Sequence, residues 1–130
     1  MLADQMISRL EYVHRAYYIH RDLKPDNFLI GRLHPKRIYI VDFGLSCRYV
    51  TKENTLRDMV TGKNFVGTSR YASMRTHQGF SQGRRDDIEQ LVYVLIYMYR
   101  GRLPWSGLNV KDRDEKERII GERKAKLDPT

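Results

Sequence analysis

The stretch YIHRDLKPDNFLI, residues 18–30, decides the fold that we expect for this chain. Positions 20–27 hold a histidine, an arginine, a lysine, an asparagine and two aspartates, and apolar residues flank them on both sides. Charged clusters are usually solvated loops, but apolar flanks keep a loop close to a core. The pattern therefore predicts a rigid polar loop beside a hydrophobic core, an arrangement that suits a site with chemistry to perform.

Composition limits the classes of partner and compartment. A chain of 130 residues is long enough for one domain with its own core, and its net charge of +8 predicts an anionic partner. Nucleic acid, a membrane surface and phosphorylated or acidic protein all fit that charge. The single cysteine, Cys47, excludes an internal disulfide and favours a reducing compartment, so we expect the cytoplasm or the nucleus.

No membrane span is expected. Met1 is followed by a helical pattern rather than by a secretory signal. The longest apolar run, LVYVLIYMY at 91–99, is far shorter than the roughly 20 residues that a span needs. This run instead predicts a buried helix.

The first half of the chain predicts a helix followed by a hairpin. Apolar residues recur at three- and four-residue steps over 3–17, which is typical of an amphipathic helix. FLI at 28–30 and IYIVDF at 38–43 are short strand candidates, and the intervening GRLHPKR supplies the glycine and proline of a hairpin connection. The polar loop therefore lies between the helix and the hairpin.

The second half predicts a long loop and two helices. Residues 44–82 show neither helical nor strand periodicity, and a loop of this length in a compact domain is usually functional. A central helix follows at 83–101, with Asp86 and Asp87 in its first turn and a middle that is apolar all round. Residues 111–126 predict a charged helix with opposite-sign side chains four residues apart.

Two motifs join these elements in a candidate active site. HRDLKPDN at 20–27 matches the catalytic loop of protein kinases, and DFG at 42–44 is its expected companion. A DFG tripeptide alone is common and could be a coincidence, but the longer motif is specific, and the two stand in the right order with a hairpin between them. The chain therefore resembles a protein kinase.

The chemistry of phosphoryl transfer explains these residue types. The reaction needs a carboxylate to accept the proton of the attacking hydroxyl, oxygen ligands for a metal ion, and a cation near the transferred group. We expect Asp22 to be the base, Asn27 and Asp42 to be the metal ligands, and Lys24 to be the cation. His20 is expected to order the loop by hydrogen bonding rather than to act as an acid or base.

More of the chain resembles one kinase family, casein kinase 1. Most protein kinases end the activation segment, here 42–75, with Ala-Pro-Glu, whereas this sequence has Ala-Ser-Met at 72–74, which is similar to the divergent ending of casein kinase 1. The stretches that carry the resemblance are HRDLKPDNFLIG, VDFGLS, GTSRYASMRTHQG, RRDDIEQL and LPWSGL.

The resemblance implies further roles for individual residues. Asp87 would anchor the backbone of the catalytic loop, and Thr68 would bond the base and its cation. Leu29 would lie under the adenine ring of ATP, and the backbone of Asp26 would lie near the ribose. The implied cofactors are ATP and Mg²⁺, and Lys24 implies Ser or Thr rather than Tyr as the acceptor.

The resemblance also implies acidic or phosphorylated protein substrates. Casein kinase 1 enzymes favour a Ser or Thr downstream of a phosphorylated or acidic residue, which they hold in a basic pocket. Arg70, Gly107 and Lys116 stand at the matching positions. The alternative is that Arg70 and Lys116 are ordinary solvated charges.

The fold class implied is α+β, the mainly helical C-terminal lobe of a kinase-like fold with a short catalytic-loop hairpin, in which the catalytic loop covers 18–30. The sequence has no glycine-rich loop and no strand lysine before the catalytic loop. We therefore expect 1–130 to be a partial kinase domain that lacks the N-terminal lobe and the last helices.

Two functions fit this partial domain. One is a casein kinase 1-type Ser/Thr kinase, of which this chain is a piece with weak or no activity by itself. The other is a truncated pseudokinase or protein-interaction module without catalysis. The intact catalytic residues favour the kinase. Nucleic-acid binding is not expected, because the basic charge is accompanied by no recognition motif.

Overall fold

The computed structural model describes residues 1–127, so the last three residues of the expected domain lie outside the described part. Its helices are α1 (Leu2–Arg15), α2 (Met74–His77), α3 (Arg84–Arg100) and α4 (Arg113–Ala125). Its strands are β1 (Tyr18–Ile19), β2 (Phe28–Ile30), β3 (Ile38–Ile40) and β4 (Cys47–Arg48), and a 3₁₀ turn, η1, covers Pro25–Asn27. β1 pairs with β4 and β2 pairs with β3, both antiparallel. Helices and two small sheets thus give the described residues an α+β fold.

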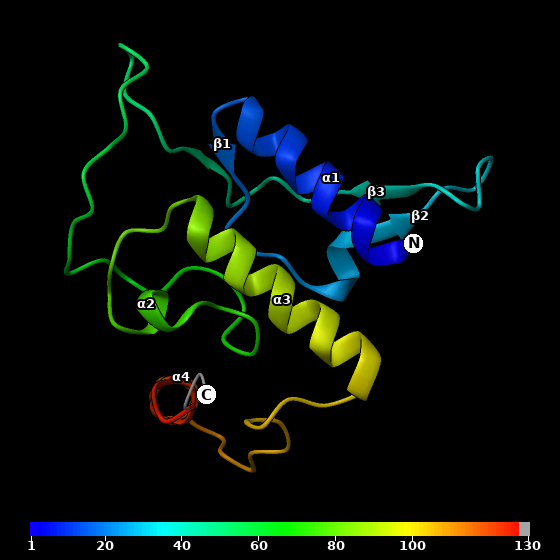
Figure 1. The fold of residues 1–130 in the computed structure, drawn as a ribbon. Coiled ribbons are helices and arrows are strands. Elements are labelled where there is room, and N and C mark those ends of the chain that lie inside the picture. The colour runs from blue at the N-terminus through cyan, green and yellow to red at the C-terminus, as the bar shows by residue number, and fades with distance from the viewer. Residues whose placement is uncertain (128–130) are drawn as a thin grey trace.

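Helix α3 runs through the middle of the molecule (Figure 1). Helix α1 and the β2–β3 hairpin lie on one side of it, and α2 and α4 lie on the other. A buried core joins the two sides, and Leu23, inside the polar loop, is a fully buried part of it. The members of this core are Met6, Leu10, Leu23, Ile38, Tyr71, Leu91, Val94, Leu103, Trp105 and Ile120.

Helix α1 turns one apolar stripe toward the core. Met6, Leu10 and Val13 are buried, as the periodicity predicted, whereas Ile7 is 55% exposed. Tyr17 lies beyond the end of the helix with a left-handed backbone φ of 67°. The helix expected over 3–17 is therefore too long, because the chain turns at Tyr17 to enter β1.

The β2–β3 hairpin is shorter than predicted. Phe28 pairs with Ile40, but the strand expected over 38–43 ends there. Asp42 has a left-handed φ of 64°, which interrupts the extended conformation. The prediction of a strand through residue 43 is wrong, and Asp42 is exposed instead of lying within a strand.

The segment 44–82, expected to be one loop, contains β4 and α2. Strand β4 pairs with β1 next to the polar loop. Ser73 caps α2, since its Oγ accepts the N–H of Thr76. Elements of two and four residues are too short to carry a period, so sequence periodicity did not reveal them.

Helix α3 begins after Gly83 and ends before Gly101, within one residue of the prediction at each end. Its central position agrees with the prediction, but the expectation that its apolar run is buried is wrong in part, since one side is open. Ile88 and Val92 are 53% and 47% exposed, whereas its fully buried residues include polar ones. These are Asp86, Asp87 and Gln90. No helix among residues 1–127 is long and apolar enough to cross a membrane.

Helix α4 lies within the predicted charged segment 111–126. Asp112 caps its start by accepting the N–H of Glu115 at 2.7 Å. The helix packs against α2 at Gly121, where an added Cβ would lie 2.9 Å from the Cβ of His77. Glycine therefore lets α4 approach the end of the activation segment closely.

Candidate active site

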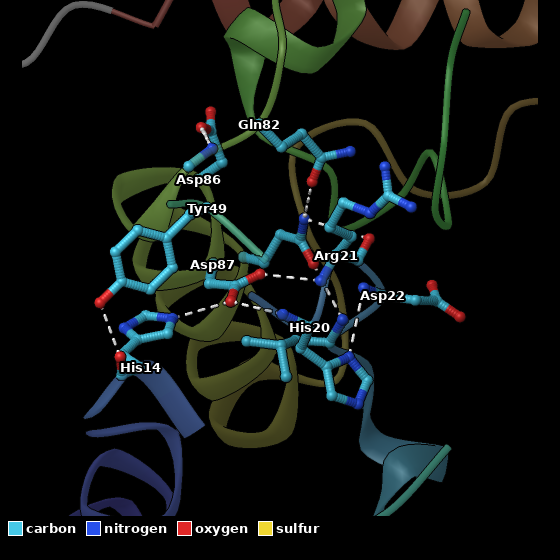
Figure 2. A network of polar contacts seen from close by, with 11 residues as sticks. His14, His20, Arg21, Asp22, Tyr49, Gln82, Asp86 and Asp87 are labelled. Atoms are coloured by element: carbon cyan, nitrogen blue, oxygen red, sulfur yellow. Dashed lines mark hydrogen bonds and ion pairs between the residues drawn. The ribbon is translucent and has the colours of Figure 1, made fainter. Parts of the chain in front are cut away.

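The buried carboxylate of Asp87, on α3, organises the polar loop (Figure 2). Its Oδ2 accepts the backbone N–H of His20 and the Nε2–H of His14, both at 2.8 Å, and its Oδ1 accepts the backbone N–H of Arg21 at 2.9 Å. Arg21 has a left-handed φ of 70°. A non-glycine residue keeps such a conformation only where its surroundings enforce it. The prediction that Asp87 anchors the loop backbone is confirmed.

His20 joins the loop to the DFG segment. Its ring is fully buried, and Nε2 lies 2.9 Å from the carbonyl oxygen of Val41. A carbonyl only accepts, so Nε2 carries the proton and Nδ1 is free to accept the N–H of Asp22 at 3.3 Å. The ring also packs edge-on against Phe43, with 5.1 Å between centroids. His20 thus orders the loop, as predicted.

Gln90 is a buried contact that the sequence analysis missed. Its Oε1 accepts the backbone N–H of Leu23 at 2.8 Å, and its Nε2 donates to Oε1 of Gln82 at 3.2 Å. The loop is therefore bonded to α3 at a second point, one turn beyond Asp87. The sequence gives little signal for this contact, because Gln90 follows Glu89 in the polar first turns of the helix, just before the apolar run at 91–99.

Asp22, Lys24 and Thr68 form one hydrogen-bonded group. Nζ of Lys24 lies 2.9 Å from Oδ2 of Asp22, and Oγ1 of Thr68 donates to Oδ1 of Asp22 at 2.7 Å. The hydrogen bond with Asp22 raises the pKa of Lys24; burial opposes this, and the charges of Asp22, Asp26 and Asp42 reinforce it. Lys24 therefore stays an ammonium. Both oxygens of the Asp22 carboxylate, whose residue is 7% exposed, are held in place.

Gly67 allows the activation segment to reach this group. Its φ is 110°, and an added Cβ would lie 2.6 Å from the carbonyl oxygen of Arg21. No side chain fits that distance. The missing side chain therefore lets the backbone pass close enough for the next residue, Thr68, to bond Asp22.

Asn27 and Asp42, the expected metal ligands, lie on adjoining backbone segments. The N–H of Val41 donates to the carbonyl oxygen of Asn27 at 3.0 Å, which brings the residue before Asp42 against Asn27. Nδ2 of Asn27 donates to the carbonyl oxygen of Asp22 at 2.9 Å. Among the residues that the structure describes, Oδ1 of Asn27 accepts no hydrogen bond, and the Asp42 residue is exposed. An amide oxygen and a carboxylate are oxygen donors of the kind that Mg²⁺ takes beside phosphate and water.

Asn27 and Asp42 alone would not make a complete metal site. Residues 1–127 contain no group of three or more His, Cys, Asp or Glu side chains arranged to hold a metal ion. Mg²⁺ commonly uses one or two carboxylates plus substrate phosphates rather than an all-protein cage. The donors present therefore fit a metal ion that arrives with a nucleotide.

The two residues expected at the nucleoside are both accessible. Leu29 lies on β2 and is 49% exposed. Asp26 lies in η1, between Lys24 and Asn27, and is exposed. An exposed leucine on the hairpin, next to the candidate metal ligands, offers an apolar face for a flat ring.

A hollow of about 500 Å³ opens beside the hydrogen-bonded group of Asp22, Lys24 and Thr68, which is the candidate catalytic group, and contains the three expected anion-binding residues. The Arg70 guanidinium stands over the rings of Tyr97 and Tyr71, 5.3 and 5.9 Å from their centroids. Gly107 has a φ of 75° and no atom within 4 Å of an added Cβ. The charged or site-related residues that line the hollow are Lys24, Asp26, Thr68, Arg70, Gly107 and Lys116.

The charges in this hollow favour an anion. Lys24, Arg70 and Lys116 face a single carboxylate, that of Asp26, among its lining residues. Opposite charges attract more strongly where solvent is partly excluded. Asp22, Leu29 and Asp42 do not line the hollow. The structure therefore joins the anion-binding residues to Lys24 and Thr68, the partners of Asp22, and to Asp26, but not to Leu29 and Asp42.

The arrangement combines a fixed carboxylate, a paired ammonium, two oxygen donors for a metal ion and a basic hollow. A carboxylate that is held at both oxygens can accept a proton from a hydroxyl group, and the neighbouring cations can stabilise transferred negative charge.

The family model that describes the protein kinase domain matches residues 1–128.

Proposed function

Because the chain belongs to the protein kinase family, we propose that it contributes to a Ser/Thr kinase of casein kinase 1 type. This kinase transfers the γ-phosphate of ATP to Ser or Thr in acidic or phosphorylated proteins of the cytoplasm or nucleus. The observation that carries the proposal is the continuity of the hollow, which has Lys24 and Thr68 at the catalytic group and Arg70 and Lys116 among its lining residues.

Asp22 acts as the base in this proposal. Thr68 and Lys24 fix its two oxygens, so its carboxylate keeps one orientation toward an incoming hydroxyl. The hydroxyl gives its proton to Asp22 as its oxygen attacks the γ-phosphorus, the bond from that phosphorus to the bridging oxygen breaks, and ADP leaves. Lys24 stabilises the negative charge on the transferred group, because its raised pKa keeps it protonated.

Asn27 and Asp42 would hold the metal ion, and Leu29 would support the adenine ring. Mg²⁺, when bound, would supply positive charge to the phosphate oxygens. Phosphoryl transfer by protein kinases also uses a glycine-rich loop and a strand lysine, and neither motif is present in residues 1–130. We therefore expect these residues alone to bind nucleotide weakly.

Arg70 recognises the phosphate or carboxylate of the substrate. A guanidinium can bind a phosphate through two parallel hydrogen bonds, and the stacking on Tyr97 keeps this one in place. Gly107 leaves space for the anion to approach the backbone. Lys116 adds a point charge from α4. Together they favour a substrate with a phosphoserine or acidic residue upstream of the acceptor.

Replacing Arg70 by alanine tests this recognition. We expect R70A to weaken binding of a phosphoserine-containing peptide by about tenfold or more, since hydrogen bonds to charged groups contribute roughly 1.5–3 kcal/mol. Binding of the same peptide without phosphate should change less than about twofold. Fluorescence polarisation of labelled peptides measures both. R100A, at an exposed arginine of α3, is the matched control.

Two outcomes would count against the proposal. Equal losses for the phosphorylated and unphosphorylated peptides would mean that Arg70 does not recognise phosphate. Saturable peptide binding without any phosphoryl transfer, in a protein that joins these residues to a glycine-rich loop and a strand lysine, would favour the non-catalytic interaction module.

A further inference from the structure

The side chain of Lys124, on α4, is buried against the end of the activation segment. The residue is 3% exposed. Its Nζ donates to the carbonyl oxygen of Ser69 at 2.8 Å, to that of Ala72 at 2.5 Å, and to Nε2 of His77 at 3.1 Å. All three protons of the ammonium therefore have acceptors, whereas Lys116, the other lysine of this helix, is partly exposed.

Aromatic rings surround the same ammonium. Nζ lies 4.9 Å from the centroid of the Trp105 ring and 5.2 Å from that of Tyr93. Ring faces attract cations, which offsets part of the cost of burying the charge. Burial lowers the pKa of Lys124 to about 7, and the charge of Glu89 opposes that shift. Burial and the charge of Lys124 lower the pKa of His77 to about 4, so its ring is neutral and can accept.

The contacts of Lys124 belong to a wider attachment of residues 69–72. Nε1 of Trp105 donates to the carbonyl oxygen of Arg70 at 2.7 Å. Lys124, on α4, and Trp105, in the loop before α4, therefore bind three of the four carbonyl groups of residues 69–72. The backbone N–H groups of Tyr71 and Ala72 both donate to the carbonyl oxygen of Thr68, at 3.0 Å. The segment is thereby tied to Thr68, which bonds Asp22.

We infer that Lys124 is a positioning residue, which fixes residues 69–72 against α4 and so holds Thr68 and Arg70 in place for the peptide substrate. The inference concerns the substrate site of the proposed kinase and rests on that proposed function. Among residues 1–127, Lys124 hydrogen-bonds only to backbone carbonyl groups and to His77, and it is absent from the residues that line the hollow, so it touches neither the hollow nor the catalytic group. It acts through the backbone of the activation segment.

Methionine at position 124 is the sharpest test. Its side chain has about the length of lysine but no donor, so the carbonyl groups of Ser69 and Ala72 would lose their partner inside the protein. We expect K124M to speed amide hydrogen exchange at Tyr71 and Ala72 by roughly tenfold or more, since an unpaired buried polar group is costly. Amide hydrogen exchange in α1, on the opposite side of α3 from α4, should stay unchanged. K126M, at the exposed lysine that caps the C-terminal end of α4, is the matched control.

A second measurement separates positioning from mere stability. K124M should weaken binding of a phosphoserine peptide by roughly tenfold, because Arg70 and Thr68 lose their fixed backbone. Its affinity for Mg·ATP should remain within about twofold of the starting protein, because Asn27, Leu29 and Asp42 do not line the hollow that residues 69–72 help to form. A variant that lost both affinities equally would contradict a positioning role.

The exchange experiment distinguishes failure of this inference from failure of the proposed function. Unchanged exchange at Tyr71 and Ala72 would overturn the inference, and so would equal acceleration throughout α1 and α3, which would make Lys124 only a core residue. A protein that binds neither peptide nor nucleotide, yet shows the local acceleration, would refute the kinase proposal. The attachment of residues 69–72 by Lys124 would then stand as a property of the fold alone.

Discussion

Replacing Asp87 by alanine is expected to lower the free energy of unfolding by about 3–5 kcal/mol, the range observed when one partner of a buried, charge-assisted network is removed. The carboxylate is fully buried and accepts hydrogen bonds from His14, His20 and Arg21. Its removal leaves two backbone N–H groups and an imidazole N–H without their acceptor. Asp87 also holds Arg21 in its left-handed conformation, and alanine offers no acceptor in its place.

Urea denaturation followed by the fluorescence of Trp105, the single tryptophan, measures this change. D58A, at an exposed aspartate, is the control and should stay within about 0.5 kcal/mol of the starting protein. A loss below about 1 kcal/mol in D87A would mean that the loop keeps its conformation by other means. The network in Figure 2 would then not be what orders the loop.

Replacing Asp22 by asparagine is expected to slow phosphoryl transfer to a serine peptide by about 10²–10⁴-fold, the usual contribution of a general base. The change keeps the shape of the side chain, and the amide oxygen can still accept from Thr68. The amide nitrogen, however, cannot accept a proton or bond the ammonium of Lys24. Folding should therefore survive while the chemistry is lost.

Single-turnover transfer from radiolabelled Mg·ATP, with protein in excess, measures the rate in the protein that carries these residues. D26N is the matched control, because Asp26 stands in the same loop but is exposed and outside the hydrogen-bonded group. It should retain more than about a tenth of the rate, since its charge acts on Lys24 only from a distance. Equal rates for D22N and the starting protein would exclude Asp22 as the base.

The parts of the fold that could be predicted from the sequence are those with a long period or a specific motif. Helix α3 was placed within one residue at each end, because an apolar run stands between two glycines. The β2–β3 hairpin could be predicted from two short apolar stretches joined by a connection that contains a glycine and a proline. The link between Asp87 and the catalytic loop came from the resemblance to casein kinase 1, not from periodicity.

Other features depend on tertiary contacts that leave no periodic signal. The early end of β3 follows from the left-handed Asp42, which a pattern of apolar residues could not reveal. The burial of Lys124 was missed because a lysine in a charged helix is expected in solvent, and only the packing of α4 on residues 69–77 shows its acceptors. The exposed side of α3 departs from the buried helix that the apolar run alone predicted, because an apolar helix surface does not say what covers it.

The measurement that tests the central claim most directly is an amide NMR titration of the protein with ATP, with and without Mg²⁺. We predict saturable shifts at residues 24–29 and 41–44 that are larger with Mg²⁺, and loss of that difference in D42A. These segments contain Lys24, Asn27, Leu29 and Asp42. The absence of any saturable shift there, or identical shifts with and without Mg²⁺, would contradict the assignment of this site to Mg·ATP and phosphoryl transfer.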